Sequence, residues 1–215
     1  MSSSNPKDAM AFRAISIRAC LYIVVLIGLM QGIFLIDAQR AGGPDFSEVS
    51  LTEFAQAALL FACSAMMLYV RHRLRTLPTV GLLLWGFFAA SFVRENDAWL
   101  DRFIFDGAWQ LLVVVIVLPT LYIVIRRRHR FLSEFRKMAN TLGFGLFASG
   151  FLITYVFSRL YGRSVFWQAL MGDQYLYVVK SAAEEVAELA GYSLLLFACI
   201  EIVLLARRLR HGQRG

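Results

Sequence analysis

The chain has 215 residues, of which 59% are hydrophobic and 17% are charged, and its formal net charge is +7. Soluble globular proteins average ~45–50% apolar and about 25% charged residues, so this composition excludes an ordinary soluble domain. The positive charge comes without a recognisable RNA- or DNA-binding motif, which excludes nucleic acid as the expected partner.

Six apolar runs, each close to the ~20 residues that cross a bilayer, follow one another along the chain. They predict an all-α integral membrane protein, a bundle of six transmembrane helices. A cytoplasmic tail over 1–17 precedes one transmembrane domain over 18–206, and a basic tail follows over 207–215. The spans are expected at 18–36, 51–70, 78–94, 107–125, 141–160 and 182–206.

The distribution of charge predicts how the bundle is oriented. Sixteen of the 22 basic residues fall in the two tails, at Arg18 where the first span begins, and in the segments 71–77 and 126–140, whereas twelve of the 15 acids fall at the other ends of the spans. By the positive-inside rule both termini are cytoplasmic, in a plasma membrane of the bacterial inner-membrane type. The basic segments are expected to contact anionic lipid headgroups on the cytoplasmic side.

Polar residues at three predicted helix starts have the pattern of helix caps. Ser50 with Glu53, and Ser181 with Glu184, form the S-x-x-E sequence of a capping box, in which side chains satisfy free backbone amides. Asp106 precedes the fourth span and is expected to cap it. These acids are therefore interpreted as structural.

The third span is followed by RENDAWLDRFIFD, residues 94–106, which combines charged and large apolar side chains. Such a segment suits a short interfacial helix on the outer side, anchored by Trp99 and Trp109. Glu95 and Arg102 are interpreted as surface charges of this helix.

Three other charges of this segment form a candidate polar site. Arg94, Asp97 and Asp101 follow i, i+3, i+7 spacing and therefore share one face of a helix. Arg94 and Asp97 lie where the segment joins the third span, and an interior role is expected for both.

The fifth span brings small residues and one further arginine. Gly143, Gly145 and Gly150 predict close packing with a neighbouring helix. Arg159 lies at the outer end of this span, and a guanidinium matches a carboxylate in bidentate geometry. Arg159 is thus a second candidate partner, besides Arg94, for an acid within the membrane.

The sixth span begins SAAEEVAELAGY and holds the acids that capping does not explain. Glu185, Glu188 and Tyr192 share one face, and Ala187 with Gly191 forms a small-xxx-small pair beside it. Glu188 lies seven residues past the predicted cap, roughly 10 Å along a helix. An ionisable group at that depth usually faces the bundle interior and has a partner. We therefore expect Glu188, supported by Glu185, to pair with Arg94 or Arg159.

Histidine and cysteine provide no recognisable metal or haem site. All three histidines fall in arginine-rich cytoplasmic segments, which excludes haem and His/Cys zinc sites as expectations. Cys20, Cys63 and Cys199 fall in different spans at different depths and are interpreted as small packing residues, not disulfides. The outer carboxylates suit Ca²⁺ or Mg²⁺ through oxygen ligands, and pairing with arginines alone is the alternative.

Three functions are compatible with this pattern. The first is a small transporter-like or ligand-binding protein whose outer carboxylate–arginine site holds a cation, a proton or a polar headgroup. The second is an accessory or assembly subunit that pairs with another membrane protein through intramembrane charges. The third is a carboxylate-dependent enzyme acting on lipid. Because the chain lacks a nucleophile elbow and a phosphate-binding glycine loop, the enzyme is the least expected of the three.

Overall fold

The computed structural model of the protein describes residues 6–40 and 51–212, and every regular element in these segments is helical. The chain divides into two compact units, Met1–Asp45 and Phe46–Gly215, where the sequence predicted one transmembrane domain. In its described part the first unit is a single helix, α1, which runs from Pro6 to Arg40 and includes most of the predicted amino-terminal tail. The all-α class is confirmed for the described residues.

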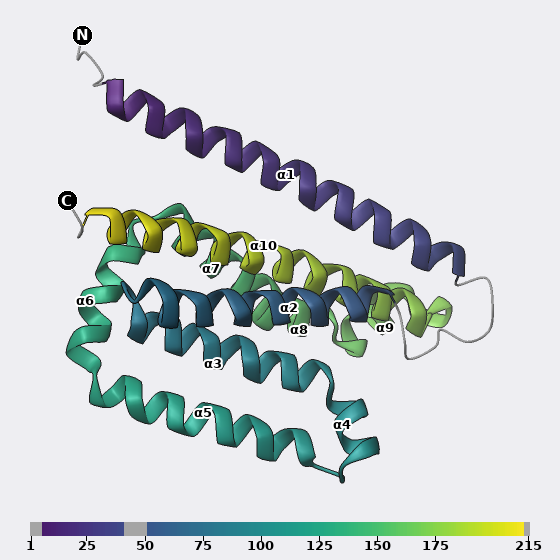
Figure 1. The fold of residues 1–215 in the computed structure, drawn as a ribbon. Helices are drawn as coiled ribbons and strands as arrows, with labels where there is room; N and C mark the ends of the chain where they lie inside the picture. Colours follow the sequence, from purple (N-terminus) through teal and green to yellow (C-terminus); the bar gives the residue numbers. More distant parts are fainter. Residues whose placement is uncertain (1–5, 41–50, 213–215) are drawn as a thin grey trace. The chain divides into compact units, whose positions relative to one another are not determined.

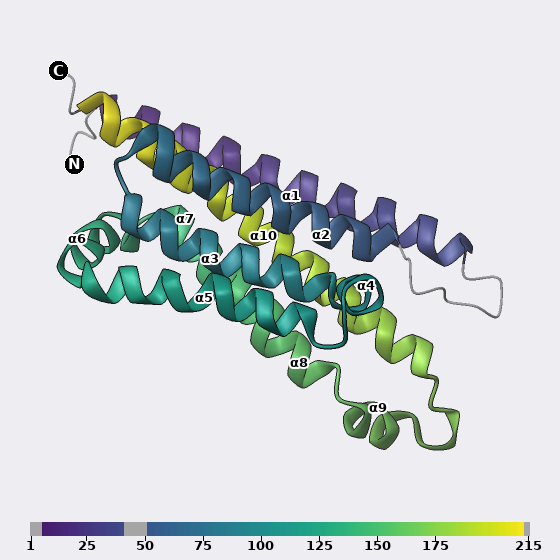
Figure 2. The same cartoon turned by 60° about the horizontal axis from the view of Figure 1, so that its bottom comes forward.

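The second unit is a helical bundle in which α10 contacts α7 and α2, α2 contacts α3, and α3 contacts α5, while α6 connects α5 to α7 (Figure 1, Figure 2). The elements are α2 (Leu51–Tyr69), η1 (Val70–Leu74), α3 (Pro78–Glu95), α4 (Asp97–Phe103), α5 (Ala108–Arg126), α6 (Arg128–Ala139), α7 (Leu142–Phe151), η2 (Leu152–Phe157), α8 (Ser158–Tyr161), α9 (Ser164–Met171), η3 (Gly172–Gln174) and α10 (Tyr177–Gly212). The segments η1 and η2 are π-helical, and η3 is a 3-10 turn.

Five helical segments of the described chain are long and apolar enough to cross a membrane: Arg13–Ile33, Leu51–Leu74, Ala108–Arg126, Leu142–Tyr161 and Tyr177–Gly212. Helix α3, which corresponds to the expected third span, does not reach this standard. Its 18 residues include Pro78, Thr79 and Ser91 and end in Arg94 and Glu95. Since α3 lies between α2 and α5, much of its surface meets protein, so fewer of its residues need to be strongly apolar.

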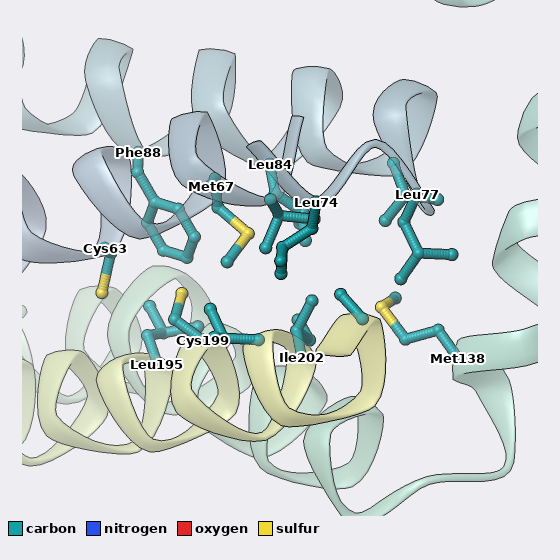
Figure 3. Packing of buried hydrophobic residues seen from close by; sticks show 14 of the residues in the cluster. Cys63, Met67, Leu74, Leu77, Leu84, Phe88, Met138, Leu195, Cys199 and Ile202 are labelled. Atoms are coloured by element: carbon teal, nitrogen blue, oxygen red, sulfur yellow. The ribbon is translucent and has the colours of Figure 1, made fainter. Parts of the chain in front are cut away.

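The core of the second unit lies where α2 and α3 face α10 (Figure 3). Met67, Phe88 and Leu195 are fully buried there. Cys63 and Cys199 belong to the same core as free cysteines, and their thiol groups interact with each other. Their role as packing residues is confirmed, but the expectation that they lie at different depths is wrong, because α2 and α10 bring both to one level.

Close packing of α7 and η2 against α10 is confirmed at three glycines. A Cβ atom on Gly150 would lie 2.8 Å from the backbone oxygen of Gly191, and one on Gly191 would collide with Thr154 Oγ1. A Cβ atom on Gly143 would lie 3.1 Å from Cβ of Glu201. Gly145, by contrast, has no neighbouring atom within 4 Å of the corresponding position. The helices thus approach closely enough to carry polar side chains of α8 onto α10.

A buried carboxylate of α6 closes the first turn of α3. Glu134 Oε2 accepts hydrogen bonds from the backbone amides of Thr79 and Val80 at 2.7 and 2.9 Å, and its Oε1 accepts one from Arg130 at 2.9 Å. These amides have no acceptor within α3, because they belong to its first turn. Sequence reasoning missed this cap since its donor and acceptor lie 54 and 55 positions apart.

Candidate functional site

The predicted ion pair of Glu188 is present, and its partner is Arg159. Arg159 Nη2 lies 2.8 Å from Glu188 Oε1, and the hydroxyl of Ser158 donates to the same oxygen at 3.2 Å. Ser158 and Arg159 open α8, directly after the π-helical segment η2, while Glu188 projects from α10. Glu188 is buried, as its depth along the sixth span predicted.

Arg159 also bridges to a second carboxylate one turn earlier on α10. Arg159 Nη1 lies 3.3 Å from Glu184 Oε1, and Lys180 Nζ donates to Glu184 Oε2 at 2.6 Å. The expectation that Ser181 and Glu184 form a capping box is wrong, because α10 begins at Tyr177 and both residues lie inside the helix. Glu184 is therefore part of the ion-pair network.

Glu185 takes a different place from the one expected. The hydroxyl of Ser181 donates to Glu185 Oε1 at 3.3 Å, and the backbone oxygen of Glu185 accepts from Gln56 Nε2 of α2 at 3.2 Å. The first bond lies within α10, and the second ties α10 to α2. Glu184, spaced four residues before Glu188, takes the supporting role that was assigned to Glu185.

Glu95, at the end of α3, was assigned to the surface by sequence reasoning, and this assignment is wrong, because protein covers most of its side chain. The hydroxyl of Tyr192 donates to Glu95 Oε2 at 3.0 Å, and Arg94 Nη2 lies 3.8 Å from the same oxygen. Tyr192 is almost completely buried, so its hydroxyl requires an acceptor. Its position on the face of Glu188 was the available signal that a further polar group lies opposite.

Asp97 and Asp101 stabilise the turn of the chain after α3 by accepting hydrogen bonds from backbone amides. Asp97 Oδ1 accepts from the amide of Ala98 at 2.7 Å, in the first turn of α4. Asp101 Oδ1 accepts from the amide of Gly107 at 3.0 Å. Both carboxylates thus bond to backbone amides of the turn, and the interior role expected for Asp97 stays a prediction.

The expectation that Asp106 caps the fourth span, which is α5, is wrong. The residue that precedes α5 is Gly107, in a left-handed conformation with φ of 86°, and no side chain caps the helix there. Asp106 precedes this glycine and lies exposed in the turn. Glu53 lies in the first turn of α2, as expected, while Ser50 lies outside the described residues.

Three ion pairs form one unit, here named the carboxylate–arginine cluster: Arg94, Glu95, Arg159, Glu184 and Glu188. Glu188 interacts electrostatically with Arg94 and Glu95 as well as with Arg159. With Lys180 on Glu184, the three carboxylates face three positive charges.

Burial divides the cluster by the sign of its charges. The side chains of Glu95, Glu184 and Glu188 are 11%, 18% and 9% exposed, whereas those of Arg94 and Arg159 are 39% and 46% exposed. The carboxylates are thus covered by protein, and the accessible side of the cluster is made of guanidinium groups. Within the described residues, no group of three or more His, Cys, Asp or Glu side chains is arranged to hold a metal ion.

Comparisons with protein-family models, with curated proteins and with solved structures find no match for this chain.

Proposed function

We propose that this protein is a ligand-binding membrane protein that holds an anionic polar headgroup against Arg94 and Arg159. The observation that carries the proposal is the difference in exposure between the two signs of charge within the cluster. Guanidinium groups bind phosphate and carboxylate through charge-assisted, often bidentate, hydrogen bonds. A cation or proton is less well supported, because the carboxylates already accept from arginine, lysine and tyrosine side chains.

The other two functions have weaker support. A carboxylate of a partner subunit would have to reach the same half-exposed arginines as the headgroup, and co-purification of a stoichiometric partner would favour this function over headgroup binding. A lipid-acting enzyme needs a nucleophile or an activated water, and the cluster offers carboxylates that are held in ion pairs.

Headgroup binding can be measured by native mass spectrometry of the purified protein with phosphatidylglycerol or phosphatidylcholine added. We expect phosphatidylglycerol to bind more tightly, and Arg94→Gln to weaken it about tenfold or more, since a hydrogen bond to a charged group is worth about 1.5–3 kcal/mol. Arg163→Gln, an exposed arginine outside the cluster, is the matched control and should bind like the wild type. Equal affinity for both lipids, unchanged by Arg94→Gln and Arg159→Gln, contradicts the proposal.

We further propose six spans in a plasma membrane, with both termini in the cytoplasm and α3 as the third span. The concentration of Lys and Arg in the tails and in 71–77 and 126–140 supports this orientation. Reporter fusions after residues 45, 74, 100, 132, 170 and 212 should report out, in, out, in, out and in. An inverted signal at residue 74 or 132 rules this topology out.

A further inference from the structure

An apolar groove lies beside Arg94, between α3 and α5. Along α3 it is lined by Gly86, Ala90 and Arg94, and along α5 by Trp109, Val113 and Val117, at four-residue spacing on both helices. Positions four apart lie on one face of a helix, so the groove follows both helix axes. The two helices come into contact at Gly86, where a Cβ atom would lie 2.8 Å from Thr120 Cγ2.

The groove has polar groups at one end. Arg94 is the only charged residue among those that line it, and Ser91 with Tyr155 of η2 supplies two hydroxyls nearby, joined by a 2.6 Å hydrogen bond. The remaining wall is apolar apart from Thr120, which is buried. A ligand that matches this wall is apolar along its length and carries a negative charge at its end.

The dimensions fit one hydrocarbon chain. The cavity has a volume of about 390 Å³, which at roughly 30 Å³ per water-sized group holds about a dozen such groups. Its wall on α3 extends from Leu83 to Arg94, roughly 16 Å at the helical rise. The volume therefore matches one acyl chain, and a second chain of the same lipid is expected to remain in the bilayer.

We infer that the groove binds one acyl chain of an anionic amphiphile, whose carboxylate or phosphate is held by Arg94 next to Ser91 and Tyr155. This inference rests on the proposed function, and it adds where the acyl chain lies and how many acyl chains the protein binds. It selects an acid over a neutral ester of the same length, because the groove offers a cation and no carboxylate among its lining residues.

Photo-crosslinking locates the chain directly. The probes are palmitate with a diazirine near the chain end, its methyl ester, and phosphatidate with the same group on one acyl chain. We expect the acid to label α3 or α5 near Leu83 and Val117, with the ester labelling at least tenfold less. Labelling by palmitate alone identifies a free fatty acid, and labelling by phosphatidate identifies a lipid that inserts one chain.

Two variants that fill the groove provide the comparison. Ala90→Phe and Val117→Phe add volume inside it, and each should reduce labelling about tenfold, whereas Leu118→Phe, on the exposed side of α5, should leave it unchanged. If one of these variants fails to fold, the other still tests the inference.

The outcomes separate the two proposals. Labels outside α3 and α5, or labelling unaffected by both filling variants, overturn the groove while headgroup binding to Arg94 and Arg159 stands. Equal binding of phosphatidylglycerol and phosphatidylcholine in native mass spectrometry, unchanged by Arg94→Gln and Arg159→Gln, overturns the proposed function.

Discussion

Replacing Arg159 by alanine is expected to lower the free energy of unfolding by about 3 kcal/mol, more than any substitution of its partners. The change leaves the buried carboxylate of Glu188 and the partly buried carboxylate of Glu184 without the guanidinium that bridges them. Removing one member of a buried ion pair costs about 3–5 kcal/mol, and the lower end applies because Arg159 is 46% exposed. Unfolding in mixed detergent micelles measures the difference.

Replacing Glu188 should lower the free energy of unfolding less than replacing Arg159 does, and this difference is the more specific part of the prediction. Glu188→Gln leaves a half-exposed guanidinium that still pairs with Glu184, and the amide oxygen can accept from Ser158, so we expect a cost of about 1 kcal/mol. A double-mutant cycle isolates the coupling between Arg159 and Glu188. Coupling near zero, or a larger loss for Glu188→Gln than for Arg159→Ala, contradicts this account of the cluster.

Gly191→Leu is expected to prevent the close packing of α10 against η2. Even a Cβ atom at this position would collide with Thr154 Oγ1 and lie 3.0 Å from the Thr154 amide nitrogen and 3.1 Å from the Gly150 oxygen. Two of these atoms belong to the backbone and cannot rotate away. Overpacking of this kind costs about 1–3 kcal/mol and occasionally more, and we expect the upper end or a protein that does not fold.

Gly145→Ala is the matched control for this prediction. Gly145 lies on α7, which packs against α10, but no atom lies within 4 Å of the added methyl group. Alanine is favoured over glycine inside a helix by roughly 0.5–1 kcal/mol, so thermal stability in detergent should stay equal or rise. A Gly191→Leu protein as stable as Gly145→Ala would show that α7 and α10 are not in the described contact.

Much of this architecture could be predicted from the sequence because membrane helices are marked by composition. Three of the five membrane-long segments begin within one residue of their expected start, and the pairing of Glu188 followed from its depth. Helix α3 is harder to recognise, because protein rather than lipid covers much of its surface. Helix α3 can therefore be largely buried although its sequence is less apolar than that of the other spans.

The errors at the site have one physical origin, which is that spacing does not fix where a helix begins or how it is rotated. Ser181 and Glu184 match a capping box in sequence, yet α10 starts four residues earlier, so the same carboxylate meets Arg159. Glu95 and Arg94 are neighbours at the end of α3, and only the position of Tyr192 on α10 shows that Glu95 points inward. Contacts of this kind depend on tertiary packing.

The most direct test of the central claim is an experimental structure of the protein in nanodiscs that contain phosphatidylglycerol. The account predicts density for an anionic headgroup within hydrogen-bonding distance of Arg94 or Arg159, while Glu95 and Glu188 remain buried behind them. Density for a cation between the carboxylates, or a headgroup density absent from both arginines, would contradict it.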